Sequence, residues 1–386
     1  AMQRPYANPG RISSPSIPVW EAKLTMSSEF GKILKVSIFG QSHGEGIGVV
    51  IDGLPPGETL DLAAIDTFMR RRAPGRSRLS TPRQEADKPE FVAGLLDNVT
   101  CGAPLCALIR NRDTRSGDYE QLRDIPRPGH ADYPATIRYK AAQDVRGGGH
   151  FSGRLTAPLC IAGAICLQLL AKRGIFIGAH IAAVAGIDDD PLPEQGLDAD
   201  FLQQISGKPF AVINDAAGEK MQQAILAAAE DEDSVGGIIE CCAINFPAGV
   251  GNPMYEGLDN RLAQAIFGIP AIKGLEFGSG FAGSRLRGSA NNDPWILQDG
   301  KVRTTSNHHG GILGGLSSGM PLVYRVAVKP TPSIAKTQLS VSLSRQENTP
   351  LSIKGRHDPC IVPRAVPCLE AVTAIVLLDL LLEANL

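Results

Sequence analysis

The sequence RGGGHFSGR at residues 146–154 stands directly before an apolar run at residues 155–170. Three consecutive glycines give the backbone unusual conformational freedom and let it approach a ligand closely. Apolar residues in the run recur at the spacing of one helix face, and Pro158 falls near the first turn, where a missing N–H does little harm. The pattern therefore predicts a flexible loop that leads into the N-terminus of a helix.

This predicted loop carries the side chains of an anion-binding site. Arg146, His150, Ser152 and Arg154 surround the glycines. Free N–H groups at a helix N-terminus, the positive end of the helix dipole and guanidinium groups all attract anions. The alternative is a tight turn capped by Ser152. The loop matches neither the GxxxxGK[ST] nor the GxGxxG phosphate loops, and Ser152 is not in a G-x-S-x-G nucleophile elbow.

Composition and charge argue against several classes of protein. The chain has 386 residues, 43% of them hydrophobic, enough for one large domain or two ordinary ones. Its net charge of −2 argues against a nucleic-acid or membrane-surface partner. The apolar run at residues 371–378 is too short to span a bilayer. The eight cysteines include no C-x-x-C pair, which favours reduced core thiols in a cytoplasmic protein over a disulfide framework or a metal site.

The two ends of the chain and its middle differ in character. Residues 1–25 are rich in proline, serine and glycine and lack the apolar segment of a signal peptide, so we expect a disordered leader or tag there. One folded domain is expected over residues 26–386. Within it, the acidic, proline-containing residues 187–204 predict a surface excursion, and residues 368–382 predict a C-terminal helix.

Several further clusters combine glycine with polar side chains. Ser42 and His43 lie among four glycines, and His130 follows a Pro-Gly turn. Five arginines within residues 70–78 suit bidentate recognition of phosphate and carboxylate, although a solvated charge run is the alternative. For His180, a core or surface position without a catalytic role is the simpler interpretation. Together the clusters indicate a site for a polyanionic small molecule.

Seven of these motifs occur in the order and spacing of one known family. They are FGQSHG (39–44), RRRAPGRSR (70–78), RPGHADY (127–133), RGGGHFSGR (146–154), SNHHGGILGG (306–315), KPTPS (329–333) and GRHDPC (355–360). The chain resembles chorismate synthase over residues 30–386, and it is similar to the short bacterial form that lacks its own flavin reductase. The resemblance implies an α+β fold, with a helical core between two antiparallel sheets in a single large domain, assembled as a homotetramer.

The resemblance also implies an activity. Such an enzyme is a lyase that catalyses the last step of the shikimate pathway, which leads to the aromatic amino acids. Its substrate, 5-enolpyruvylshikimate 3-phosphate, loses phosphate and a C6 hydrogen in a 1,4-anti elimination and becomes chorismate. Reduced FMN is required although the reaction has no net redox change, and an external flavin reductase or another reductant supplies it.

Matched residue by residue, the resemblance assigns roles within this chain. His43, beside Ser42, lies near the departing phosphate, and His130 lies near the flavin and stabilises its anionic reduced form. Ser152 and Asp358 relay the C6 proton. The arginines that bind the anionic groups of the substrate are Arg72, Arg78, Arg154 and Arg356. The residues that bind the cofactor are His150, Phe151, Ser152, Pro270, Ala271, Gly314, Lys329, Pro330, Thr331, Pro332, Ser333 and Arg356.

Two positions depart from the family pattern. Many members read Arg-Ser-Ser where this chain has His150, Phe151 and Ser152, so only the Ser152 side chain carries over. Pro270 replaces a common asparagine, which leaves a backbone contact there. Two other functions remain open: a flavin oxidoreductase that consumes NADPH with its substrate, and a non-catalytic phosphate- or RNA-binding module built on the arginine run. A steep salt dependence of oligonucleotide binding would identify the second.

Overall fold

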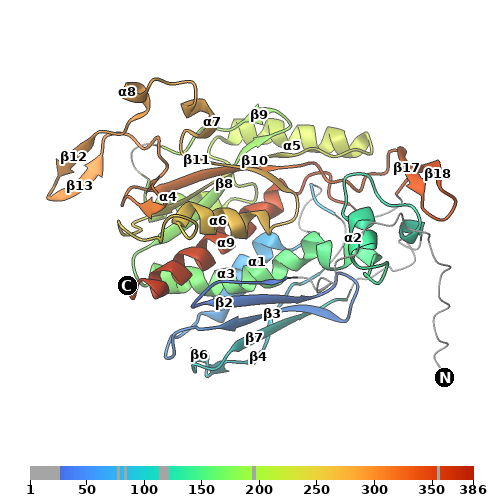
Figure 1. The fold of residues 1–386 in the computed structure, drawn as a ribbon, viewed down its shortest axis with the longest axis horizontal. Helices are drawn as coiled ribbons and strands as arrows, with labels where there is room; N and C mark the ends of the chain where they lie inside the picture. Colours follow the sequence, from blue (N-terminus) through green and yellow to red (C-terminus); the bar gives the residue numbers. More distant parts are fainter. Residues whose placement is uncertain (1–26, 76–78, 82–84, 113–120, 194–196, 354–356) are drawn as a thin grey trace.

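The computed structural model describes residues 27–75, 79–81, 85–112, 121–193, 197–353 and 357–386. Two five-stranded antiparallel sheets face each other across a layer of helices, as Figure 1 shows. One continuous set of buried apolar residues runs from the first sheet through these helices to the second sheet. The arrangement confirms the predicted α+β class, with a helical core between two antiparallel sheets in a single large domain.

The first sheet has the strand order β1-β2-β3-β7-β4. Within it, Val49 pairs with Ala107 and Ile47 with Ile109, and all four side chains are buried. Because side chains alternate between the two faces of a strand, this set points to one face, where α3 packs. The strands are β1 (Glu29–Phe30), β2 (Lys35–Gly40), β3 (Gly46–Asp52), β4 (Glu90–Ala93) and β7 (Leu105–Arg110).

The second sheet has the order β11-β16-β10-β8-β9. At its centre the buried Ile239 pairs with Val326 on one side and with Ile181 on the other. Helices α4 (Ala199–Gly207) and α5 (Asp215–Glu230) both contact β8, and α5 lies on the side of the sheet opposite the helical core (Figure 1). The strands are β8 (Phe176–Val184), β9 (Ile187–Asp188), β10 (Gly237–Ile244), β11 (Ile272–Phe277) and β16 (Leu322–Val328).

Four helices lie between the sheets. They are α1 (Leu62–Arg72), α3 (Thr156–Ala171), α6 (Leu258–Phe267) and α9 (Val362–Glu383). α3 and α9 approach each other so closely that a Cβ atom on Gly163 would lie 2.2 Å from the Cβ of Ala371. The sequence predicted one apolar face on α3, but the helix is buried on nearly all sides.

In the part of the chain that the structure describes, two helical segments are long and apolar enough to cross a membrane by length and composition alone, namely Gly153–Ala171 and Val362–Glu383. Inside the protein, however, 78% and 89% of their apolar windows are buried. Both therefore serve as core helices of this fold.

A buried carboxylate joins the end of α9 to the first sheet. Asp379 accepts hydrogen bonds from the backbone N–H groups of Ile33 and Leu34, both at 2.8 Å, and of Lys32, at 2.9 Å. It also pairs with the guanidinium group of Arg261 on α6. This single side chain holds three separate segments together, and each charge has its partner, as burial requires.

One predicted helix begins elsewhere, and the predicted surface segment contains regular structure of its own. α9 begins at Val362 rather than at residue 368, and it contains Pro367. The predicted excursion at residues 187–204 instead contains β9 and the start of α4, which Asp198 caps by accepting from the N–H of Phe201 at 2.8 Å.

The remaining elements are short and lie around the sandwich. They are β5 (Leu95–Leu96), β6 (Val99–Thr100), α2 (Asp132–Arg138), the 3₁₀ turns Arg146–Phe151 and Gly153–Leu155, α7 (Gly280–Gly283), α8 (Gly288–Asn291), β12 (Trp295–Gln298), β13 (Lys301–Thr304), β14 (Ile312–Leu313), β15 (Leu316–Ser317), β17 (Gln338–Ser342) and β18 (Glu347–Leu351).

Candidate active site

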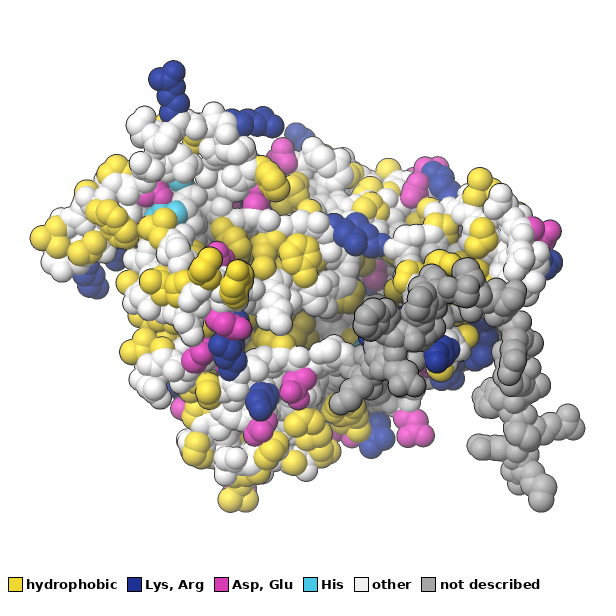
Figure 2. Space-filling model, in the orientation of Figure 1, with side chains coloured by type: hydrophobic (Ala, Val, Ile, Leu, Met, Phe, Trp, Pro, Cys, Tyr) yellow, Lys and Arg dark blue, Asp and Glu magenta, His cyan; other side chains and the backbone are white. Residues whose placement is uncertain are grey.

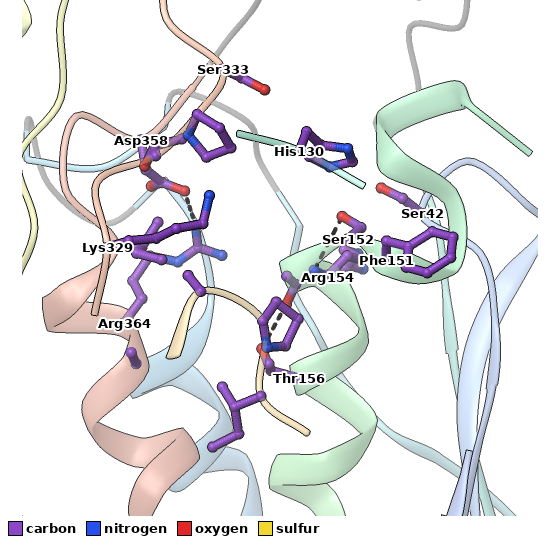
Figure 3. Close-up of a pocket in the computed structure, with 18 of the residues that line it drawn as sticks. Ser42, His130, Phe151, Ser152, Arg154, Thr156, Lys329, Ser333, Asp358 and Arg364 are labelled. Atoms are coloured by element: carbon purple, nitrogen blue, oxygen red, sulfur yellow. Dashed lines mark hydrogen bonds and ion pairs between the residues drawn. The ribbon is translucent and has the colours of Figure 1, made fainter. Parts of the chain in front are cut away.

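A cavity of about 710 Å³ opens at the N-terminal ends of α3 and α9. Figure 3 shows α9 with Arg364 and Asp358 on one side, and the glycine loop with Ser152 and Arg154 on the other. This volume lies within the range typical of small-molecule sites. Because the cavity lies at the N-terminal ends of α3 and α9, the positive ends of both helix dipoles point toward it, which favours an anionic ligand.

The glycine loop forms one wall, and its glycines are required there. Gly147, Gly148 and Gly149 all have positive φ, at 58°, 84° and 55°. A Cβ atom on Gly147 would lie 2.1 Å from Nδ1 of His43, and one on Gly149 would meet a backbone oxygen at 2.0 Å. Only glycine lets this backbone lie directly against the histidine.

Ser152 and His150 anchor the two ends of this loop. The Ser152 hydroxyl accepts a hydrogen bond from the N–H of Arg154 at 3.3 Å, so the capped turn considered as an alternative is present. It coexists with the predicted position at the entry to a helix. Nδ1 of His150 lies 2.8 Å from the carbonyl oxygen of Gly40 at the end of β2. The loop is thus tied to the first sheet.

Ser42 and His43, between β2 and β3, also line the cavity, and both are buried. The N–H of Ser42 donates to the carbonyl of Gly149 at 3.1 Å. The FGQSHG and RGGGHFSGR motifs, about a hundred residues apart in sequence, are therefore joined directly through their backbones.

The second histidine, His130, sits in a charged cluster. Its Nδ1 lies 2.7 Å from Oδ1 of Asp132 and 3.1 Å from Nη2 of Arg127. A carboxylate can only accept, so the shorter contact requires the hydrogen on Nδ1 and leaves the lone pair of Nε2 free. Nε2 faces the glycine loop, since a Cβ atom on Gly148 would lie 3.2 Å from it.

Burial and the contacts within the cluster together set its protonation. Burial lowers the pKa of His130, with Arg127 acting in the same direction and the hydrogen bond to Asp132 opposing both. The pKa of Asp132 is lowered far below its usual range, because its bonds with Arg127 and His130 outweigh the burial that would raise it. At neutral pH the cluster therefore holds a neutral imidazole beside a closed Arg–Asp ion pair.

Two of the predicted anion-binding arginines are themselves held by carboxylates. Asp87 contacts Nη1 of Arg72 at 2.6 Å and also pairs with Arg154, while Glu85 lies 3.7 Å from Arg154. Burial would lower the pKa of Arg72, but Asp87 raises it above its usual value. Burial and the neighbouring Arg72 lower the pKa of Arg154 despite Asp87. The two guanidinium groups are thus compensated by two carboxylates.

Asp358 lies on the opposite wall, before the start of α9. Its Oδ1 accepts from the N–H of Thr81 at 2.8 Å, and its Oδ2 accepts from Nη1 of Arg364 at 2.6 Å. Both oxygens are therefore oriented while the carboxylate still borders the cavity.

The KPTPS segment contributes a cation and hydroxyl groups. Nζ of Lys329 donates to the carbonyl of Gly129 at 2.6 Å, and burial, followed by Lys273, lowers its pKa. Oγ1 of Thr331 is buried and has no hydrogen-bond partner among the described residues. A half-buried lysine with a lowered pKa and an unsatisfied hydroxyl are both groups that an anionic oxygen would stabilise.

The cavity gathers most of the predicted site residues. Those that line it are Ser42, His43, Arg72, His130, His150, Phe151, Ser152, Arg154, Pro270, Ala271, Lys329, Thr331, Pro332, Ser333 and Asp358. Gly314 instead lies in the turn between β14 and β15, and Pro330 is not among the lining residues. Arg78 and Arg356 lie outside the described residues, as does the predicted leader.

Sequence reasoning missed several residues that shape the site. Arg127 belongs to the RPGHADY motif, but its position alone did not reveal that it contacts both Asp132 and, at 3.3 Å, Ser333. Arg364 and Cys368 on α9 lie in no polar motif. His180 is buried in the second sheet and does not line the cavity, as the simpler interpretation held.

Together the fold and the cavity define an α+β protein whose loops build a cavity that favours an anionic ligand at the ends of two core helices. Known proteins agree with this class. A family model described as chorismate synthase matches residues 34–382. The chain is 48% identical over 361 residues to the chorismate synthase of Dehalococcoides mccartyi, covering 94% of this chain and 98% of that one. It is 45% identical over 353 residues to that of Thermococcus kodakarensis, covering 92% and 97%.

A solved structure gives the same result. A crystal structure of chorismate synthase superposes with a TM-score of 0.73 at 28% identity, covering 92% of this chain and 93% of that one. The chain belongs to the chorismate synthase family.

Proposed function

We propose that this protein is a lyase that converts 5-enolpyruvylshikimate 3-phosphate to chorismate by 1,4-anti elimination of phosphate. The observation that carries the proposal is that residues of six separated motifs converge on one cavity, whose described lining includes four histidines, four arginines and an aspartate. The substrate has two carboxylates and a phosphate, and the cavity lies at the positive ends of two helices.

We further propose that reduced FMN binds in this cavity. The unsatisfied hydroxyl of Thr331 and the ammonium group of Lys329 suit a terminal phosphate, together with Ser333. His150, Phe151 and Ser152 would hold the ring system from the glycine loop. When bound, reduced FMN supplies electron density that eases the loss of phosphate without net redox change.

The protein's own residues then bind the substrate and manage its protons. His43, which lies against the glycine loop, would stabilise the charge on the departing phosphate or donate a proton to it. Ser152 and Asp358 would receive and relay the C6 proton. The lone pair on Nε2 of His130 faces this space, and an anionic ligand would raise the pKa that burial lowers.

The arginine assignment carries a specific consequence. A carboxylate or phosphate of the substrate would compete with Asp87 for the guanidinium hydrogens of Arg72 and Arg154. Because those charges are compensated already, we assign much of the net attraction to Arg78 and Arg356. Arg356→Ala should then weaken substrate binding strongly, and unchanged substrate affinity would contradict this assignment.

The test is an anaerobic incubation of the protein with the substrate and dithionite-reduced FMN, following release of phosphate and formation of chorismate. We expect both products in equal amounts with the flavin present only catalytically, and none with oxidised FMN. Steady consumption of NADPH with substrate would instead favour an oxidoreductase.

Two histidine variants sharpen this test. His43→Ala and His130→Ala should each lower turnover by about 10²–10⁴-fold, because each removes acid–base or electrostatic help. His308→Ala is the matched control, since His308 does not line the cavity. Wild-type rates in both cavity variants would remove the assignment.

We also propose a cytoplasmic homotetramer. The β12–β13 hairpin projects beyond the sheets (Figure 1), and hydrophobic side chains gather on it in Figure 2. Leu297 is 76% exposed there and Val302 66%. Such side chains fit an interface between copies. Light scattering should give four copies for the wild type and for Leu339→Glu, which alters an exposed side chain on β17, but fewer for Leu297→Glu.

A further inference from the structure

Two cysteines from the central helices meet at the floor of the cavity. The Sγ atom of Cys160 on α3 lies 3.8 Å from the Sγ atom of Cys368 on α9. Cys368 lines the cavity, next to Arg72 and Arg364 along its wall. Cys166 lies on the same helix as Cys160 and is equally buried, but it does not line the cavity. Among the described residues, Cys160 and Cys368 form the pair that connects a buried thiol to the cavity.

The backbone geometry at this point suits a bond between the two sulfurs. Gly163 follows Cys160 and Ala371 follows Cys368 by about one helical turn each. The Cβ that Gly163 lacks would overlap that of Ala371, so the two helices nearly touch there. Disulfides need Cβ atoms about 3.5–4.5 Å apart, which requires such a close approach.

The two thiols differ in their proton affinity. A hydrogen bond donated by Cys160 is the main cause that lowers the pKa of Cys368 to about 7, and Arg72 acts in the same direction against burial. Burial raises the pKa of Cys160 well above its usual value. Of the two thiols, Cys368 therefore loses its proton more readily, with Cys160 in contact as a hydrogen-bond donor.

We propose that Cys368 and Cys160 form a peroxide-reactive dithiol that closes to a reversible disulfide under the active-site cavity. The Cys368 thiolate attacks one oxygen of hydrogen peroxide, the O–O bond breaks, and hydroxide leaves and is protonated to water. This gives a sulfenic acid. The sulfur of Cys160 then attacks the Cys368 sulfur, the S–O bond breaks, and a second water leaves. Two thiols are oxidised and one peroxide is reduced.

This bond would pull α9 toward α3 directly beside Arg72. We expect turnover in the proposed reaction to fall on oxidation and to recover on reduction with dithiothreitol. That consequence rests on the proposed function, whereas formation of the disulfide does not. The chemical measurement is therefore made first and separately.

The experiment treats the fully reduced, full-length protein with stoichiometric hydrogen peroxide, blocks remaining thiols with N-ethylmaleimide and maps peptides by mass spectrometry. We expect a peptide that links Cys160 to Cys368, lost on reduction. Cys160→Ser should leave a sulfenic acid on Cys368 that dimedone traps, Cys368→Ser should leave Cys160 unreacted, and the control Cys166→Ser should behave as wild type.

The wild-type peptide map decides the proposal even if a variant does not fold. Oxidation confined to the exposed Cys101, with Cys160 and Cys368 both recovered as maleimide adducts, would overturn it. So would equal oxidation of Cys160 and Cys166, because burial alone would then explain both.

Discussion

Asp132→Asn tests the charged cluster around His130 most directly. The substitution keeps the shape of the side chain and removes its charge. In the native protein the carboxylate accepts from Nε and Nη2 of Arg127, both at 2.7 Å, and from the Arg127 N–H at 3.0 Å. It also fixes the Nδ1 hydrogen of His130 at 2.7 Å. An asparagine offers one acceptor oxygen instead of two.

The cost follows from these contacts. Hydrogen bonds to charged groups contribute about 1.5–3 kcal/mol each, so losing two costs about 3–6 kcal/mol. Breaking a buried ion pair by removing one partner costs a similar amount, about 3–5 kcal/mol. Arg127 is left buried with Ser333 as a remaining side-chain acceptor, and its uncompensated charge lowers the pKa of His130 further. Turnover should fall by about 10²–10⁴-fold.

Three measurements distinguish a loss of His130 orientation from a general loss of stability. Nitrogen NMR of cofactor-free protein should show the Nδ1–H tautomer of His130 in the wild type and a mixture in Asp132→Asn. Chemical denaturation gives the loss in unfolding free energy, and the anaerobic assay gives turnover. The control is Asp144→Asn, which breaks a similar pair with the 43% exposed side chain of Arg146 and should cost less than about 1 kcal/mol.

The reasoning fails if Asp132→Asn keeps both the wild-type tautomer and wild-type turnover. It fails equally if Asp132→Asn and Asp144→Asn destabilise the protein by the same amount, because burial would then have no effect on the ion pair.

Three further predictions concern other sites. His180 lies between two carboxylates, Asp189 and Glu240, which raise its pKa against the effect of burial. The stabilisation from its positive charge is therefore complete below pH ~6.5 and is lost as pH rises through the folded pKa. In urea denaturation, the stability advantage of the wild type over His180→Gln should shrink from pH 6 to 9. Gly147→Ala should displace the ring of His43 and lower turnover about 10²-fold, measured at saturating substrate. Asp379→Asn should lower the unfolding free energy by about 3–5 kcal/mol, because it removes the buried charge that faces Arg261 and leaves the more exposed Glu256 and Glu383 as its partners. An unchanged urea midpoint would refute this.

Much of the layout was predictable because local signals agree with the final structure. The glycines at 147–149 predicted a loop of unusual conformation, and all three have positive φ. The order of the motifs indicated the family, and the family resemblance in turn predicted the fold. The sequence therefore predicted that Ser42, His130 and Ser152 share one site, and all three line the cavity.

What escaped prediction depends on contacts between distant segments. Asp87 precedes a strand as an unremarkable acidic residue, and only the fold brings it against Arg72 and Arg154. The C-terminal helix was predicted to begin at residue 368, yet tertiary burial holds α9 together from Val362 through Pro367, a residue type that disfavours a helix interior. Packing between the two sheets also buries α3 on nearly all sides, which a periodicity rule cannot anticipate.

The two core helices impose an order on synthesis. β8, β10, β11 and β16 all leave the ribosome between α3 and α9. At about 5–20 residues per second, the apolar sides of α3 wait for many seconds before their partner exists. During that interval the nascent chain exposes an apolar helix that chaperones can bind, and the second sheet has not yet gained α9, the helix against which it packs. The two halves of this protein, expressed separately, should aggregate alone and become productive only when made together.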